Sequence, residues 1–215
     1  MGSFNMHIAI SKKLKEKFSF GDDFILGTVL PDLYKILLKN REVTHFERVF
    51  GQESLPDIEK FCNDYKDKKS GIVYGYLAHL IQDKIWFKEY HNKKYVEQLE
   101  NGDYYKYLKD DTIHKEEEYL KDIYTDYTII SGYLTDKYLL NREEINSQLK
   151  KCIIENKNIL EKEELINSID TKIIDYSCIY DINSNITFLT KADMDSYYNE
   201  TVIEAEKILK QFIEK

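Results

Sequence analysis

The fold is decided by the stretch Tyr74-Gly-Tyr-Leu-Ala-His79-Leu-Ile-Gln-Asp83-Lys-Ile-Trp86. Its apolar residues recur with helical spacing, so the imidazole of His79 and the carboxylate of Asp83, four residues apart, project from one face. This arrangement suits two ligands of one metal ion on a rigid element. The alternative for His79 is a core histidine satisfied by a hydrogen bond. The positions of the other histidines favour the metal site.

Composition predicts an all-α fold. The chain has 215 residues, of which 42% are hydrophobic, enough to bury one sizeable core in a single compact domain spanning residues 1–215. It contains only two prolines and eight glycines, too few turn residues for a many-stranded β fold. We therefore expect several packed helices, and the positions of the histidines add the expectation of a metal cluster in a cleft between them.

Charge and cysteine content argue against several classes of function. The net charge of −8 repels nucleic-acid phosphates and anionic membranes, so nucleic-acid binding is not expected. The three cysteines, Cys62, Cys152 and Cys178, lack C-x-x-C spacing, which argues against a disulfide framework and a cysteine zinc site. The sequence shows neither the apolar region of a signal peptide nor an apolar run of membrane-spanning length. We expect a cytoplasmic protein without a transmembrane segment.

Two predicted helices open the chain. Residues 6–18 form a short amphipathic pattern with His7 at its start. Residues 22–39 form an apolar helix that Pro31 should kink or break in two. A kink would aim Asp32 inward. Alternatively, Pro31 and Asp32 initiate a helix whose dipole favours the carboxylate.

The next segments lead to the central helix. Residues 40–53 read as a connector that holds His45. Ser54-Leu-Pro56-Asp57 predicts the start of a helix that extends to about Tyr65. The central helix follows over residues 70–90 and ends near His91.

A second histidine and carboxylate pair follows. Asp110-Asp111-Thr112 predicts a helix cap, and the helix it opens would place His114 and Glu118 on one face. The alternative for residues 116–118 is a solvated acidic first turn. Residues 119–215 are expected to form helical scaffold and one cleft wall, with amphipathic helices at 126–140, 143–155, 159–180 and 190–213.

Taken in order, the candidate ligands are His7, Asp32, His45, His79, Asp83, His91, His114 and Glu118. This order resembles that of the zinc-dependent phospholipase C family, in the phospholipase C and single-strand nuclease superfamily. The resemblance covers residues 7–118, and its most specific patches are Gly27-Thr-Val-Leu-Pro-Asp32, Thr44-His-Phe46 and Gly75-Tyr-Leu-Ala-His-Leu-Ile-Gln-Asp83. The family is an all-helical domain that holds three zinc ions through His and Asp residues plus one Glu.

The resemblance implies a first zinc held by Asp32, His45, His79 and Asp83. Asp83 would bridge to a second zinc, which His7 would ligate. A third would be held by His91, His114 and Glu118. The family's processed N-terminal residue is also a ligand, whereas Met1 lies six residues before His7. The second ion is therefore expected to be weakly held, completed by water, or bound by a further ligand that the sequence does not identify. We expect two or three zinc ions.

The ligand types predict a reaction. Imidazole and carboxylate ligands without thiolates suit zinc with open positions for water. Such ions activate the water and neutralise the attacking and leaving oxygens of a phosphodiester, so phosphoester hydrolysis is expected. Asp32 is the candidate catalytic base, and ligation alone is its alternative role. The resemblance implies a small phosphoester or phospholipid substrate.

Two alternatives to a phospholipase remain. A metal-stabilised helical protein without turnover would convert metal binding into folding free energy, and saturated, water-free coordination would favour it. A nuclease-like phosphodiesterase would use the same metal cluster with a different cleft wall.

Overall fold

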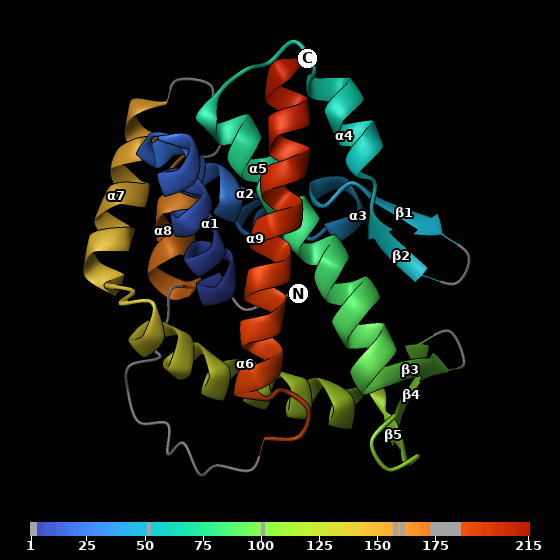
Figure 1. Ribbon diagram of the computed structural model, residues 1–215. Coiled ribbons are helices and arrows are strands. Elements are labelled where there is room, and N and C mark those ends of the chain that lie inside the picture. The colour runs from blue at the N-terminus through green and yellow to red at the C-terminus, as the bar shows by residue number, and fades with distance from the viewer. Residues whose placement is uncertain (1–3, 51–52, 100–101, 157–158, 160–161, 173–185) are drawn as a thin grey trace.

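The computed structural model describes residues 4–50, 53–99, 102–156, 159, 162–172 and 186–215 (Figure 1). The protein is mostly helical, which confirms the predicted all-α class. Its helices are α1 (Phe4–Phe18), α2 (Asp22–Leu38), α3 (Arg41–Thr44), α4 (Ile58–Tyr65), α5 (Gly71–Ile85), α6 (Glu116–Lys137), α7 (Arg142–Glu155), α8 (Lys162–Lys172) and α9 (Lys191–Glu214).

Two small antiparallel sheets accompany the helices and lie on the same side of the molecule (Figure 1). The strands are β1 (Glu47–Phe50) paired with β2 (Glu53–Pro56), and β3 (Val96–Leu99), β4 (Tyr104–Tyr107) and β5 (Ile113–Lys115) in that order. The predicted helix start at Ser54 is wrong, because Ser54 lies in β2. The helix begins after Asp57, whose carboxylate accepts a hydrogen bond from the Lys60 backbone.

The closest helix contact is the crossing of α2 and α5. A Cβ atom at Gly75 would lie 2.0 Å from the carbonyl oxygen of Phe24, and one at Gly27 would lie 2.1 Å from that of Ile72. Only glycine allows two backbones to approach so closely. The crossing brings the backbone of α2 within reach of the side chains of α5.

Helix α2 continues through Pro31 from Asp22 to Leu38. The expectation that Pro31 could break this segment into two helices is therefore wrong. Residues 24–33 of α2 are all buried. We attribute the continuity to this packing, because burial of the apolar helix offsets the local cost of the missing proline N–H.

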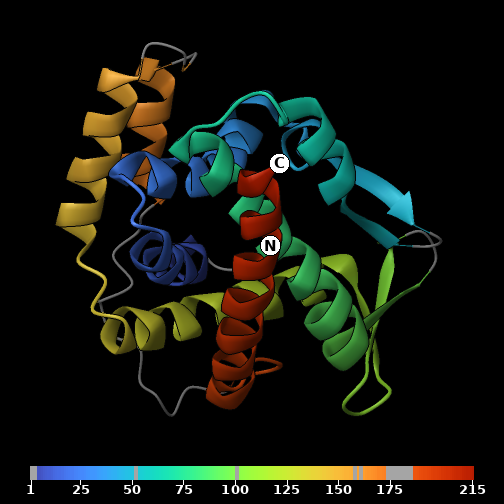
Figure 2. The same ribbon diagram turned by 45° about the horizontal axis from the view of Figure 1, so that its top comes forward.

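Helix α5 passes directly into η1 (Trp86–Tyr95), a π-helix, and both views show the two as one rod (Figures 1 and 2). Helix α9 packs against α5, where the Tyr197 hydroxyl donates a hydrogen bond to the carbonyl oxygen of Gln82 at 3.0 Å. The rod is thus held in the core on one side and reaches the small sheets at its far end.

The second half of the chain surrounds this centre. Helices α7 and α8 lie side by side at one end of the molecule (Figures 1 and 2). Helix α6 is a single helix from Glu116 to Lys137, where the sequence predicted a second helix over 126–140. The helix predicted over 190–213 is confirmed as α9, and the hydroxyl of Thr190 caps it by accepting a hydrogen bond from the Asp193 backbone. Cys178 and the end of the helix predicted over 159–180 lie outside the described residues.

Among the helices of the described residues, none combines the length and the apolar character that a membrane span requires.

Candidate metal centre

Five of the eight predicted ligands meet at the centre of the molecule, contributed by three helices and one connector. They form two overlapping groups, one of His7, Asp32 and His79 and one of His45, His79 and Asp83, and the ligand atoms within each group lie within 4.8 Å of one another. Helix α1 carries His7, α2 carries Asp32, α5 carries both His79 and Asp83, and His45 directly follows α3. The sequence patterns therefore converge on one place.

The distances within this cluster match the edges of a coordination polyhedron. Nε2 of His45 lies 3.4 Å from Oδ1 of Asp32 and 3.7 Å from Oδ2 of Asp83, and Nε2 of His79 also lies 3.7 Å from that Oδ2. Nε2 of His7 lies 3.4 Å from Oδ1 of Asp83. Ligands of a tetrahedral zinc with bonds of about 2.0–2.1 Å are about 3.4 Å apart.

The protonation of His79 is determined by its partner. Its Nδ1 lies 2.8 Å from the carbonyl oxygen of Thr28 across the crossing of α2 and α5. A carbonyl oxygen only accepts, so Nδ1 carries the proton and Nε2 presents a lone pair. Burial lowers the pKa of His79 well below its ordinary value, which keeps the ring neutral.

His7 and His45 are held in the same tautomer. Nδ1 of His7 lies 3.0 Å from Oε1 of Gln82, whose amide nitrogen donates to the Ser11 hydroxyl. Nδ1 of His45 lies 2.9 Å from the hydroxyl of Thr44, and that hydroxyl donates to the carbonyl oxygen of Asn40. Each Nδ1 is therefore the donor, and both Nε2 atoms present lone pairs.

Asp83 is the most strongly bound carboxylate of the cluster. The guanidinium of Arg41 donates to its Oδ2 at 2.6 Å, and Arg41 also pairs with Glu47. Burial raises the pKa of Asp83, but the charge of Arg41 and the smaller effects of the neighbouring His79 and His7 together lower it more, so the pKa falls well below its ordinary value. Asp83 is an anion with one oxygen toward His7 and the other toward His45 and His79.

The cluster consists of acceptors only. The three histidines and Asp83 are at most 1% exposed, and Asp32 is 9% exposed. Within the described part of the chain, no hydrogen-bond partner reaches the Nε2 atoms of the three histidines, Oδ1 of Asp32 or Oδ1 of Asp83. Buried polar atoms without a partner are costly, and five acceptors around one point are satisfied by a cation. The donor set of imidazoles and carboxylates fits zinc.

The ligands predicted for a third zinc are not brought together. Nε2 of His91 contacts the hydroxyl of Tyr119, and burial lowers the pKa of His91 to about 4. His114 lies on β5 and its ring stacks on Tyr107, with centroids 3.9 Å apart. Glu118 lies 3.4 Å from Nδ1 of His114 and is exposed. Among the described residues, none of these three belongs to a group of metal-ligand geometry.

The prediction that His114 lies on a helix with Glu118 is wrong. Asp110 and Thr112 form a turn in which Asp111 has a φ of 60°, and the chain then enters β5. The carboxylate of Glu118 accepts instead from the Lys115 backbone, as a helix cap. The acidic first turn, which was the alternative reading, describes this segment.

Sequence reasoning missed the residues that support the cluster. Gln82 and Thr44 fix the histidine tautomers, and Arg41 holds Asp83. Gln82 and Thr44 are sequence neighbours of predicted ligands, a signal that could have identified them. Arg41 lies in the segment read as a connector and gave no such signal.

Comparison of the chain with protein-family models, with curated proteins and with solved structures finds no match.

Proposed function

We propose that the protein is a zinc-dependent phosphoester hydrolase whose centre is formed by His7, Asp32, His45, His79 and Asp83. The observation that carries the proposal is the buried set of three imidazole lone pairs and two carboxylate oxygens, Oδ1 of Asp32 and Oδ1 of Asp83, that receive no hydrogen bond among the described residues. His79 belongs to both three-residue groups, and only its Nε2 is available to a metal ion. One nitrogen binds one ion, so the two groups do not require two ions. At least one zinc per chain is therefore expected, and Oδ1 of Asp83, which faces His7, provides a place for a second.

Zinc in such a centre supplies a Lewis acid and lowers the pKa of bound water to about 7. The residues of the chain perform the remaining tasks. His45 and His79 are fixed by their Nδ1 hydrogen bonds and present Nε2 in one orientation. Asp32 is the most exposed of the five and is the carboxylate best placed to meet solvent. We assign Asp32 the role of general base, which accepts the proton from water.

A non-catalytic metal centre is the second candidate, and one observation favours it. His45, His79 and Asp83 are completely buried, and only Asp32 reaches solvent. A saturated ion in such a place would stabilise the fold without turnover. The two candidates share the ligands and differ in whether the centre reacts with a phosphoester.

Elemental analysis of the purified protein tests the metal, and hydrolysis of bis(p-nitrophenyl) phosphate tests the reaction. We expect at least one zinc per chain, its loss in His79→Gln, and its retention in the matched control His114→Gln, which changes a histidine outside the cluster. We expect Asp32→Asn to abolish hydrolysis. A protein without zinc refutes the centre.

A zinc protein that releases no nitrophenol from several phosphodiesters and phosphomonoesters supports the non-catalytic candidate instead. Wild-type hydrolysis that survives unchanged in Asp32→Asn would refute the role of Asp32 as base and leave it as a ligand alone.

A further inference from the structure

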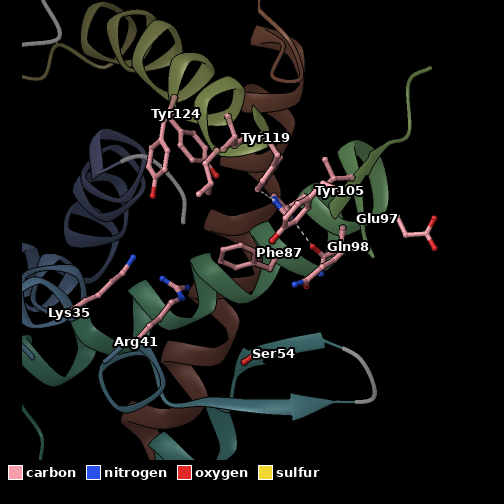
Figure 3. A pocket seen from close by; sticks show the side chains of 15 residues that line it. Lys35, Arg41, Ser54, Phe87, Glu97, Gln98, Tyr105, Tyr119 and Tyr124 are labelled. Atoms are coloured by element: carbon pink, nitrogen blue, oxygen red, sulfur yellow. Dashed lines mark hydrogen bonds between the residues drawn. The ribbon is translucent and has the colours of Figure 1, made fainter. Parts of the chain in front are cut away.

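A cavity of about 410 Å³ lies beside the cluster, between α6, η1 and the two small sheets. Two cationic side chains line it, Lys35 from α2 and Arg41 from α3, and aromatic rings line the opposite wall (Figure 3). None of the five cluster residues lines it. The cavity therefore has its own chemistry, joined to the cluster through Arg41.

Arg41 has three donor nitrogens, of which two are engaged. One pairs with Asp83 and another with Glu47, while Nη1 is buried and has no hydrogen-bond partner among the described residues. Burial lowers the pKa of Arg41, but the carboxylates of Asp83 and Glu47 raise it more, so the group stays charged. The guanidinium carbon lies 5.2 Å from the centre of the Phe87 ring, which fixes its plane.

The remaining donor and Lys35 create a place for an anion. Lys35 and Arg41 both line the cavity, and Figure 3 shows the carboxylate of Glu97 turned away from them. Arginine presents its donors in a fork that matches phosphate oxygens, and an ammonium adds a point charge. A phosphate group matches this pair of cations.

The opposite wall indicates what the phosphate carries. Tyr119 stacks on Tyr105 with ring centres 4.0 Å apart, and Tyr124 meets Tyr127 edge to face at 6.1 Å. Such a wall favours a flat aromatic group, which can stack on these rings. The volume is at the lower end of the range that encloses small ligands, so it fits a single aromatic ring better than two acyl chains.

We infer that this cavity binds a phosphate ester with an aromatic organic part, and that Arg41 is the residue that recognises its phosphate. The inference rests on the proposed hydrolase in one respect, because it places the substrate of that reaction beside the zinc centre. A zinc ion on Asp83 would also withdraw the negative charge that balances Arg41. Phosphate affinity should therefore be higher in the zinc-loaded protein than after chelation.

Isothermal titration calorimetry with inorganic phosphate tests Arg41. Because Arg41 also holds the proposed ligand Asp83, wild type and variant are compared after chelation, where Arg41→Gln should weaken phosphate binding tenfold or more. The matched control Arg48→Gln makes the same charge change on β1, outside the cavity, and should bind phosphate like the wild type. Arg41→Lys keeps the charge and should weaken binding several-fold, because one ammonium does not reproduce the three directions of the guanidinium.

Phenyl phosphate tests the aromatic wall. It should bind the wild type more tightly than inorganic phosphate, and Tyr124→Ala should remove that preference without changing the affinity for inorganic phosphate. Wild-type phosphate affinity in Arg41→Gln, or in Arg41→Lys if the first variant does not fold, overturns the inference. So does equal binding of both ligands to the wild type.

The two proposals fail separately. A protein without zinc whose phosphate binding is lost in Arg41→Gln refutes the zinc centre and retains the anion site. A zinc protein in which Arg41→Gln leaves phosphate binding unchanged retains the centre and refutes the anion site.

Discussion

The crossing of α2 and α5 predicts that Gly75→Ala disrupts both the fold and the metal centre. The new Cβ would lie 2.0 Å from the Phe24 carbonyl oxygen, whereas ordinary contact begins at 3.4 Å, so the two helices must separate by more than 1 Å. Overpacking of this kind costs about 3 kcal/mol. For a chain of this length, that cost lowers the melting temperature by roughly 6–12 °C.

The same movement reaches the cluster. Separation of the helices stretches the 2.8 Å hydrogen bond from His79 to the Thr28 carbonyl oxygen and draws Asp32 away from the two ligands on α5. Zinc content should therefore fall together with stability. The assay is thermal unfolding followed by circular dichroism, with elemental analysis of the same samples.

Gly21→Ala is the matched control for this prediction. Its Cβ would meet only the end of the Asp23 side chain, which can rotate away, so zinc content should match that of the wild type. Gly21 is the N-cap of α2, where alanine is less favourable than glycine, so the melting temperature should fall by only a few degrees. A Gly75→Ala protein with the stability and zinc content of the control would refute the argument that the glycine sets the helix separation.

Three further predictions follow from single groups. Chelation should lower the free energy of unfolding by several kcal/mol, because each buried acceptor left without a partner costs about 1–3 kcal/mol; a denaturant titration that is unchanged by chelator contradicts this. Burial lowers the pKa of His91 to about 4, so between pH 6.5 and pH 4 the unfolded chain takes up a proton at this residue and the folded chain does not. The free energy of unfolding should therefore be unaffected by His91 above pH 6.5 and fall as the pH is lowered towards 4. Between these values the wild type should lose about 3 kcal/mol more than His91→Gln in urea titrations, and parallel curves would count against it. Asp126→Ala should cost about 3 kcal/mol, because three backbone N–H groups at residues 187–189 lose their acceptor, and Asp126→Asn should cost less; equal midpoints for both variants and the wild type would exclude this role.

Helices were predictable because their signals are local. The apolar period of residues 74–86 and the cap at Thr190 act over a few positions, and the structure retains both. The short strands were not predictable in this way. Strand β5 has three residues, and its pairing with β4 depends on a turn at Asp111 with a positive φ, which the sequence Asp110-Asp111-Thr112 shares with helix caps.

The candidate site also combines residues that local sequence signals predict with residues that they do not. His79 and Asp83 could be placed on one face from their spacing alone, and the resemblance supplied His7, Asp32 and His45 as their partners. The third group is not assembled among the described residues, because His91 contacts Tyr119 and the ring of His114 stacks on Tyr107. The geometry that joins Arg41 to Asp83 spans 42 positions of the chain, and no local pattern encodes a contact of that range.

The π-helical hydrogen bonding of η1 makes the residues within and after it sensitive to a deletion that leaves the residues before it in place. The hydrogen bonds of a π-helix join residues five apart, whereas those of an α-helix join residues four apart. Deleting one residue from η1 would rotate every later side chain of the rod by about 100°. Residues such as His91 would then leave the cavity wall, while His79 and Asp83, which precede η1, would keep their places. An insertion or deletion in this segment would therefore change the wall of the cavity while the proposed metal ligands stay in place.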